Sequence, residues 1–305
     1  GRFGGDIASV MVHGGNLFAL TIYLVLSVSF ANLLFAGGAD ILKLLIFWAL
    51  GSAAIFFNLR EIALSELVVT AFMAGIIGFI FFLGFDRIGA LPAALFAAGG
   101  TYALAPLAPI LFALSGRVAV PAVVKYFKIN HDSHDYRAIK KSVTIGTLFP
   151  ALVYAGFILG VIGLSSGGVS EDAVSGLISV VPPGLLTVVG VLGLLSLWSS
   201  YLMIGLDTNA SLQYDFSLSK TLRLGIVVLA PLLLYFAGFQ NFLTLVSFAG
   251  GVFLGLEGVF IVAMWLAARR RRTGSLFPKA TPLAAYAVFA VFATALLYEI
   301  FSRLV

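Results

Sequence analysis

The stretch FALSGRVAVP, residues 112–121, interrupts a long apolar segment with polar and helix-breaking residues. It places Ser115, Gly116 and Arg117 next to one another and is closed by Pro121. Proline lacks an amide hydrogen and its ring clashes with the carbonyl four residues back, while glycine relaxes the backbone. The pattern therefore predicts a helix break between Ser115 and Pro121. Inside a membrane, such non-helical backbone survives only where it faces protein or a water-filled cavity.

The composition around this stretch is typical of a membrane protein. Of the 305 residues, 61% are hydrophobic and 10% are charged, whereas a soluble domain is about half apolar and a quarter charged. Crossing the hydrocarbon takes about 20 mostly apolar residues per helix, and such segments recur from Ile7 to Phe301. The apolar runs do not alternate with polar residues, which excludes a transmembrane β-barrel. The net charge of +5 does not indicate nucleic acid, because the basic residues lie in the joints between apolar segments.

The apolar segments predict nine transmembrane helices in one domain. We place them at residues 7–36, 41–59, 65–84, 101–126, 142–165, 184–206, 221–238, 242–268 and 282–301. Assigning the joints alternately to the two sides of the membrane puts fourteen Lys and Arg residues on one side and three on the other. By the positive-inside rule, the richer side is cytoplasmic. We expect a multi-pass protein of the cell membrane, with the N-terminus of this chain in the cytoplasm and its C-terminus outside.

The position of the broken span predicts an inverted-repeat architecture. Secondary transporters are often built from two inverted repeats, each with a broken helix that contributes to a midplane substrate site. Residues 101–268 would form the second repeat, residues 1–100 the remainder of the first, and residues 269–305 an extra helix. A complete first repeat needs two further helices, and the chain begins at Gly1 instead of Met. We therefore expect this chain to lack two N-terminal helices and to insert into a membrane without performing coupled transport.

Several motifs carry a resemblance to a known family. They are GRFGG at residues 1–5, VPAVVKYF at 120–127, RAIKKSVTIGTLFPALVY at 137–154, LVSFAGGVF at 245–253 and MWLAARR at 264–270. They are similar to motifs of the hydroxy and aromatic amino-acid permeases, in the tryptophan/tyrosine permease branch of the amino acid–polyamine–organocation superfamily. The resemblance implies an all-α leucine-transporter-type fold, of which the nine spans would be helices three to eleven. It departs at Arg117, where the family usually has His, so it supports the superfamily more than an aromatic substrate.

The broken span and the resemblance together predict a secondary active transporter that moves an amino acid by alternating access. The substrate is expected to be hydrophobic or aromatic, and the driving ion to be H⁺ or, as the alternative, Na⁺. The predicted substrate-binding residues lie in the break and in the first span: Ala113, Leu114, Ser115, Gly116, Arg117, Ser27 and Asn32. Ion coupling is assigned to Ser199 and Ser200, which match small hydroxyls of the family's eighth helix, and to Glu257. Glu257 lies in the span that corresponds to the tenth helix and departs from the family's pattern.

Each of these residues also has a structural interpretation. Arg117 is always protonated and needs a partner at membrane depth, which is either a substrate carboxylate or Glu257. Glu257 is in turn a proton carrier or an ion-pair partner. Serines in packed membrane helices commonly bond to the backbone. His13, near the cytoplasmic end of its span, is expected to be a satisfied structural histidine.

Other functional classes find less support in the sequence. No nucleophile stands at a usable spacing from a base and no nucleotide-binding fingerprint occurs, so we expect neither an enzyme nor a cofactor. The loop HDSHD at residues 131–135 has ligand-type residues but no second cluster, so we expect no metal site. The partners are expected to be an amino acid and the lipid bilayer, without nucleic acid. The alternative is a non-transporting membrane sensor or assembly protein that keeps the transporter fold.

Overall fold

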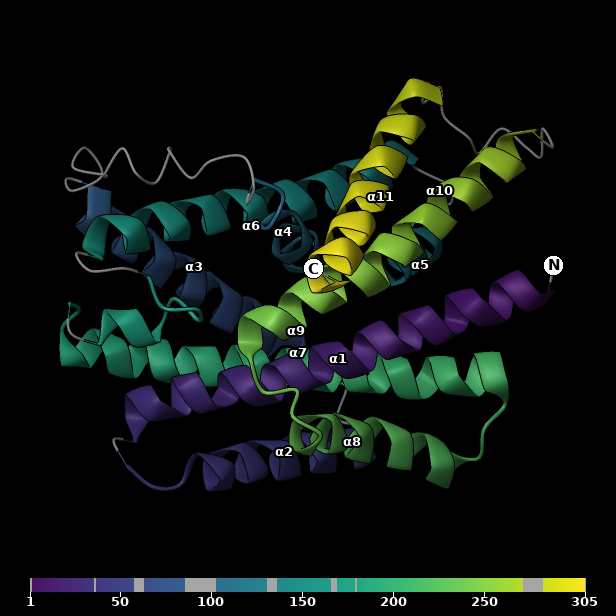
Figure 1. Ribbon diagram of the computed structural model, residues 1–305. Coiled ribbons are helices and arrows are strands. Elements are labelled where there is room, and N and C mark those ends of the chain that lie inside the picture. Colours follow the sequence, from purple (N-terminus) through teal and green to yellow (C-terminus); the bar gives the residue numbers. More distant parts are fainter. Residues whose placement is uncertain are drawn as a thin grey trace. The chain divides into compact units, whose positions relative to one another are not determined.

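The computed structural model describes residues 2–35, 37–57, 63–85, 103–130, 136–165, 169–178, 180–270 and 282–304. Every regular element within these ranges is a helix (Figure 1). The predicted loop at residues 131–135 lies outside them, as do residues 86–102 and 271–281. The elements are α1 (Arg2–Leu34), α2 (Asp40–Phe56), α3 (Ala63–Phe85), α4 (Leu107–Ala113), α5 (Ala119–Asn130), α6 (Tyr136–Leu164), η4 (Ser175–Leu177), α7 (Pro183–Phe216), α8 (Lys220–Phe236), α9 (Phe242–Phe248), η5 (Ala249–Phe253), α10 (Leu254–Arg270) and α11 (Pro282–Leu304).

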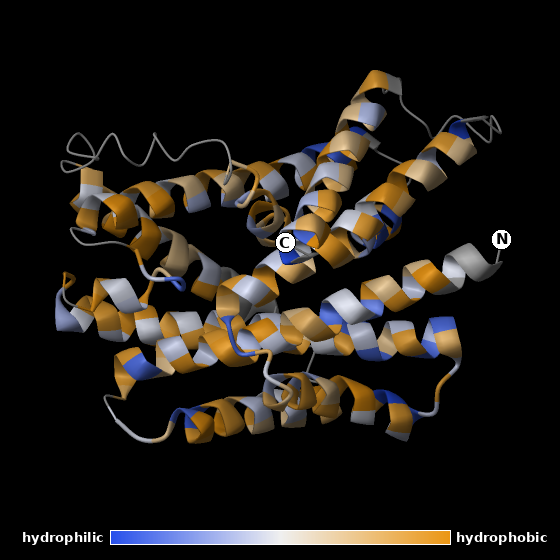
Figure 2. Ribbon diagram, in the orientation of Figure 1, coloured by the Kyte–Doolittle hydropathy of each residue, from blue (hydrophilic) through white to orange (hydrophobic). Residues whose placement is uncertain are grey.

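Six helical stretches of the described part are long and apolar enough to cross a membrane. They are Ile7–Leu34, Val68–Phe85, Arg137–Leu164, Pro183–Phe216, Phe242–Arg269 and Leu283–Arg303. Hydrophobic residues predominate along the helices (Figure 2), and large ones such as Phe82 and Leu152 are more than 70% exposed. Surface of this kind is unfavourable in water but is covered by lipid in a bilayer. The predicted class, an all-α membrane protein, is confirmed.

The remaining predicted spans are shorter or divided in the structure. Helices α2 and α8 have 17 residues each, about 25 Å at 1.5 Å per residue. The predicted span 101–126 is divided between α4 and α5. Helix α7 instead continues past the predicted end at Leu206 as far as Phe216, because no Gly or Pro interrupts the polar residues 207–216. It ends at Ser217, whose φ of 52° is left-handed.

Contacts divide the chain into two compact units. Unit 1 consists of Gly1–Ile22, Ala98–Ala113 and Thr208–Val305, and unit 2 of Tyr23–Ala97 and Leu114–Asp207. Helices α1 and α7 each contribute residues to both. The units are defined by contacts alone, so the repeat boundaries predicted from the sequence stay predictions.

Unit 1 is organised around the π-helical segment η5, which joins α9 to α10. Helices α4 and α11 both pack against η5. The contacts depend on glycine, because a Cβ at Gly250 would lie 1.9 Å from the Ala108 carbonyl oxygen of α4. A Cβ at Gly251 would likewise lie 2.6 Å from the Cβ of Glu299 in α11. Single π-turns inside α-helices are frequent at functional sites, so this junction is a candidate for function as well as for packing.

In unit 2, α3 and α6 cross at glycines. A Cβ on Gly84 would lie 2.2 Å from the carbonyl oxygen of Gly160, and one on Gly163 would lie 2.2 Å from that of Gly84. Small residues let membrane helices approach closely enough for van der Waals contact between backbones. A glycine also lets α7 pack closely against α2, because the ring of Tyr201 occupies the space that a side chain at Gly51 would need.

Candidate functional site

The predicted helix break is confirmed. Helix α4 ends at Ala113 and α5 begins at Ala119, and residues 114–118 form turns and coil. The Gly116 amide donates to the Leu114 carbonyl at 2.9 Å, and the Ala119 amide donates to the Gly116 carbonyl at 3.1 Å. Pro121 is then the third residue of α5, where its missing amide hydrogen removes no bond along the helix. The new helix begins two residues before the proline, so Pro121 lies in its first turn, where a proline is tolerated.

The backbone of the break is open to a ligand. Ser115 and Gly116 are exposed, and no atom would lie within 4 Å of a Cβ at Gly116. This glycine therefore does not serve close packing, in contrast to Gly250. Arg117 follows in the turn and is partly buried, and its carbonyl accepts from the Val120 amide at 3.1 Å.

The two predicted binding residues of α1 make local hydrogen bonds. Ser27 is 1% exposed and its Oγ donates to the Leu24 carbonyl at 2.7 Å, which is the structural interpretation of a membrane serine. Asn32 accepts from Nζ of Lys43, which also donates to the Phe35 carbonyl at 3.1 Å. Lys43 thus ties the end of α1 to the start of α2. Contact of Ser27 and Asn32 with a substrate stays a prediction.

The predicted ion-coupling serines lie on α7 in unit 2, next to Tyr201 in the sequence. Ser199 is 8% exposed, and Ser200 lies within side-chain hydrogen-bonding reach of Tyr23 on α1. Tyr201 is fully buried and faces Ser52 of α2. Within the described part of the chain, neither the Tyr201 hydroxyl nor Ser52 Oγ makes a hydrogen bond of ordinary geometry. The sequence analysis did not identify Tyr23, Ser52 or Tyr201, since one aromatic or hydroxyl residue in an apolar run carries no signal by itself.

Glu257 is partly buried on α10, and a second carboxylate on α11 lies deeper. Glu299 is 5% exposed and accepts from Arg303 Nε at 2.8 Å. Arg303 also donates to the Thr244 carbonyl at 3.2 Å and lies 5.0 Å above the Phe248 ring. The pair fastens α11 to α9. The sequence analysis missed it, although a Glu and an Arg four residues apart on a helix are a recognisable pair.

A buried polar cluster of unit 1 was also missed. His13 Nε2 lies 3.1 Å from Asp215 Oδ2, and Asn16 Nδ2 donates to Thr208 Oγ1 at 3.0 Å. His13, Asn16 and Thr208 are each at most 5% exposed. The partners from α7 lie beyond residue 206, where the predicted span ended. The available signal was the absence of a helix breaker in residues 207–216.

A third helix contributes to the same cluster. Arg223 of α8 is 8% exposed, and its Nη1 donates to Gln213 Oε1 at 2.6 Å and to the Asn209 carbonyl at 3.0 Å. Arg223 lies in the first turn of α8 and is turned onto α7, because buried carbonyl and amide oxygens there accept its hydrogen bonds.

An acidic loop residue of unit 2 organises the segment between α6 and α7. Partial burial alone would raise the pKa of Asp172, but hydrogen bonds from Ser175, Ser29 and Ser170 outweigh this effect and lower the pKa below its ordinary value. Ser170 Oγ lies 2.9 Å from Asp172 Oδ1, and the Ser175 amide donates to that oxygen at 3.0 Å. The charged carboxylate therefore holds this segment against α1 through Ser29.

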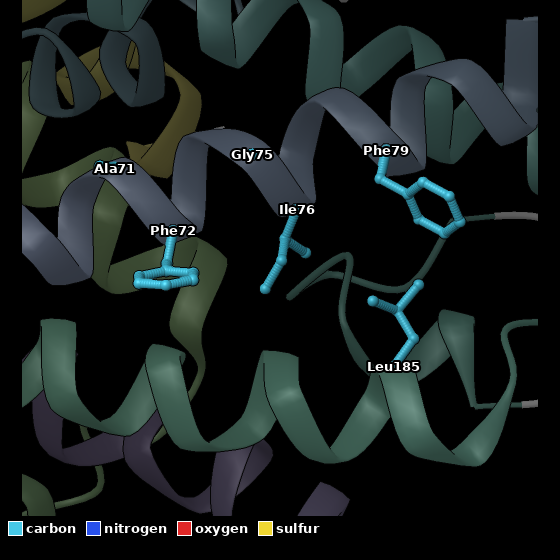
Figure 3. A pocket seen from close by; sticks show the side chains of 6 residues that line it. All are labelled: Ala71, Phe72, Gly75, Ile76, Phe79 and Leu185. Atoms are coloured by element: carbon cyan, nitrogen blue, oxygen red, sulfur yellow. The ribbon is translucent and has the colours of Figure 1, made fainter.

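Two grooves differ in chemistry. The groove in Figure 3 lies in unit 2, has a volume of about 380 Å³ and is lined by Ala71, Phe72, Gly75, Ile76, Phe79 and Leu185. Its side chains are hydrocarbon throughout, so it suits an apolar chain and offers no group to bind a charged amino acid. The other groove lies in unit 1, has a volume of about 390 Å³, and includes Ser9, Ser211, Tyr214 and Asp215 in its lining.

Comparison with protein-family models, with curated proteins and with solved structures finds no match to the chain. The resemblance to amino-acid permeases therefore stays a prediction from the quoted motifs. The residues that the structure describes contain no group of three or more His, Cys, Asp or Glu side chains that could hold a metal ion. The candidate site is accordingly defined by the helix break and by the buried polar side chains of each unit.

Proposed function

We propose that the protein is a secondary active transporter of an amino acid, and that the break between α4 and α5 binds the substrate carboxylate. The observation that carries the proposal is an open, glycine-containing backbone followed by Arg117 inside an otherwise apolar segment. The N-terminus of α5 carries a partial positive charge from its amide groups. Arg117 adds a full positive charge and a planar set of donors that matches a carboxylate.

The hydroxyl-bearing side chains of unit 2 supply the second part of the proposal. The Tyr201 hydroxyl and Ser52 Oγ are buried and lack a hydrogen-bond partner among the described residues, and oxygens of this kind can bind a cation or relay a proton. Tyr23 and Ser200 come from α1 and α7, so a change in the packing of these helices would alter the site. Coupling to H⁺ or Na⁺ is therefore compatible with this group. Hydrophobic or aromatic amino acids remain the substrates that the sequence motifs favour.

The proposal includes nine membrane crossings in a leucine-transporter-type arrangement of inverted repeats. Helices α2 and α8, at 17 residues, are at the lower limit for a spanning helix, and α4 with α5 would form one interrupted crossing. Such an interruption is tolerated in lipid only where protein or water covers it, as a substrate cavity does.

The distribution of basic residues supports a cytoplasmic N-terminus for this chain. Because the sequence contains no Cys, single cysteines at Ser133 and Ser170 can be labelled in whole cells with a membrane-impermeant thiol reagent. We expect labelling at position 170, in the acidic joint, and protection at position 133, in the basic joint. Permeabilised cells serve as the control and should allow labelling of both. The reverse pattern in intact cells would overturn the orientation.

The proposed function is tested with the protein expressed from its intact gene and reconstituted into liposomes. A panel of labelled amino acids is offered under an imposed pH gradient and, separately, an imposed sodium gradient. We expect concentrative uptake of a hydrophobic or aromatic amino acid that collapses when an ionophore removes the gradient. Absence of uptake across the panel under both gradients would contradict transport and favour a membrane sensor or assembly protein.

A further inference from the structure

We propose that His13 and Asp215 form the site at which the coupling proton binds. The inference rests on the proposed transport function and specifies its driving ion. Neither His13 nor Asp215 is among the site residues predicted from the sequence. The pair belongs to unit 1 and joins α1 to the polar extension of α7.

The geometry of the pair suits proton binding. His13 Nε2 lies 3.1 Å from Asp215 Oδ2, and the His13 side chain is 6% exposed. The other ring nitrogen, Nδ1, is buried and has no hydrogen-bond partner among the described residues. A structural histidine normally satisfies both nitrogens, so this one departs from the interpretation that the sequence favoured. The unpartnered nitrogen is the atom that gains or loses the proton while Nε2 keeps its contact with the carboxylate.

The charge balance of the step explains why it responds to the surroundings. With a neutral imidazole that donates its Nε2 hydrogen to Asp215, the pair carries one negative charge. One proton from water converts the ring to imidazolium and the pair to net neutrality, and release of that proton to water restores the first state. The imidazole is the buried member of the pair, and a charge on it is unfavourable in a low dielectric unless the carboxylate compensates it. Proton occupancy is therefore coupled to any movement that changes the distance between the two groups or their hydration.

A groove gives the pair access to water. Asp215 lines the 390 Å³ groove of unit 1 together with Ser9, Ser211 and Tyr214. Its side chain is 26% exposed, compared with 6% for His13. The carboxylate is therefore the solvent-accessible member of the pair, and the imidazole is the buried member. The three hydroxyls supply donors and acceptors along which a proton can pass.

The neighbouring elements provide charged and aromatic groups. Among the described residues, Asp215 of α7 contacts the imidazole, and Arg223 of α8 binds the same part of α7, where its Nη1 donates to Gln213 Oε1 and to the Asn209 carbonyl. The remaining contacts are aromatic: the Phe216 ring lies 5.5 Å from the imidazole, and the Phe253 ring of η5 packs against Gly14.

A second ion pair among the described residues of unit 1, Glu299 with Arg303, is a poorer proton site. Glu299 is paired with Arg303, and a guanidinium stays protonated at any physiological pH. That pair is already neutral as a whole, so it gains nothing from a further proton. The His13–Asp215 pair differs because its cationic partner can lose its charge.

The test follows the imidazole directly. The chain has three histidines, so a His131→Gln, His134→Gln background leaves His13 as the sole histidine for ¹⁵N labelling. In lipid bilayers, the ¹⁵N resonance of Nδ1 distinguishes a ring that carries the coupling proton from one that does not, and we expect to find both forms as the pH of the medium is varied. Asp215→Asn should change the proportion of the two forms, because Nε2 then loses its contact with a carboxylate. Asp172→Asn, which removes a carboxylate from the other unit, is the control and should leave the proportion unchanged.

Transport provides the second readout and separates this inference from the proposed function. His13→Gln should abolish accumulation driven by a pH gradient while retaining exchange of labelled for unlabelled amino acid. Asp215→Asn should reduce the same accumulation without abolishing it. An imidazole that keeps one protonation state throughout the titration, or a His13→Gln protein that still accumulates substrate with the pH gradient, would overturn the proton site. If the unaltered protein transports no amino acid, the proposed function fails, and the proton site fails as a coupling site with it.

Discussion

Replacing Arg117 with alanine is expected to reduce amino-acid uptake about a hundredfold while the amount of protein in the membrane changes little. The guanidinium is the one full positive charge next to the open backbone of the break, within the described part of the chain 103–130. Truncating one partner of a buried charge pair costs about 2–5 kcal/mol, and each 1.4 kcal/mol is a factor of ten in affinity. Arg117→Lys should restore uptake only in part, because the ammonium keeps the charge without the planar donor geometry.

The matched control for this prediction is Lys125→Ala on α5, the helix that follows Arg117. Lys125 is exposed and carries the same charge, so its loss should leave uptake within about twofold of the unaltered protein. Initial rates are measured in proteoliposomes at equal protein content, with thermal stability in detergent as the second readout. Unchanged kinetics in Arg117→Ala would exclude the carboxylate role. A loss of folded protein that matches the loss of uptake would assign Arg117 to a structural ion pair instead.

Gly250→Ala is expected to destabilise the protein by about 3 kcal/mol or more, the upper range for overpacking a tightly packed interior. The added methyl group would lie 1.9 Å from the Ala108 carbonyl oxygen, a distance that no relaxation of a side chain can relieve because the obstacle is backbone. Helix α4 must then move away from η5. Since α4 leads directly into the break, we expect uptake to fall together with the apparent melting temperature.

Gly225→Ala on α8 is the control for the same substitution in the same unit. No atom would lie within 4 Å of the new methyl group, and alanine is the better helix former, so the melting temperature should be unchanged or slightly higher. Both variants are compared by thermal denaturation in detergent. Equal melting temperatures for the two alanine variants would show that α4 does not pack on η5 as described.

The helix break illustrates what local sequence can establish. Helices α6 and α8 continue through Pro150 and Pro231, so a proline alone does not break a helix here. The combination of Ser115, Gly116 and Pro121 predicted the break, and the interruption occurs where this pattern predicted it. The end of α7 illustrates the opposite case. Polar residues after Leu206 suggested that the span stops, yet the helix continues because its polar side chains find partners on α1 and α8. Hydropathy predicts where lipid ends and does not predict where a helix ends.

The candidate site was predictable only in part for the same reason. The break and Ser199 with Ser200 were identified from short motifs, whereas Tyr23, Asp215 and Glu299 acquire meaning only beside their neighbours. Ser27 and Asn32 were singled out as polar residues in an apolar span, and the structure shows each of them in a local hydrogen bond. A polar residue in a membrane helix signals that a partner exists without signalling which one.

The sequence by itself determined that this is an all-helical membrane protein, where most helices lie and where one of them breaks. These properties follow from the hydropathy of about 20 consecutive residues and from the polar and helix-breaking residues between Ser115 and Pro121. Only the tertiary structure decided that His13 meets Asp215, 202 residues away, and that the Gly250 backbone meets Ala108. Lipid tails are as apolar as leucine side chains, so burial in a bilayer does not select the neighbour of each helix. That choice depends on glycine contacts and on the pairing of polar groups, which form only once the helices are packed.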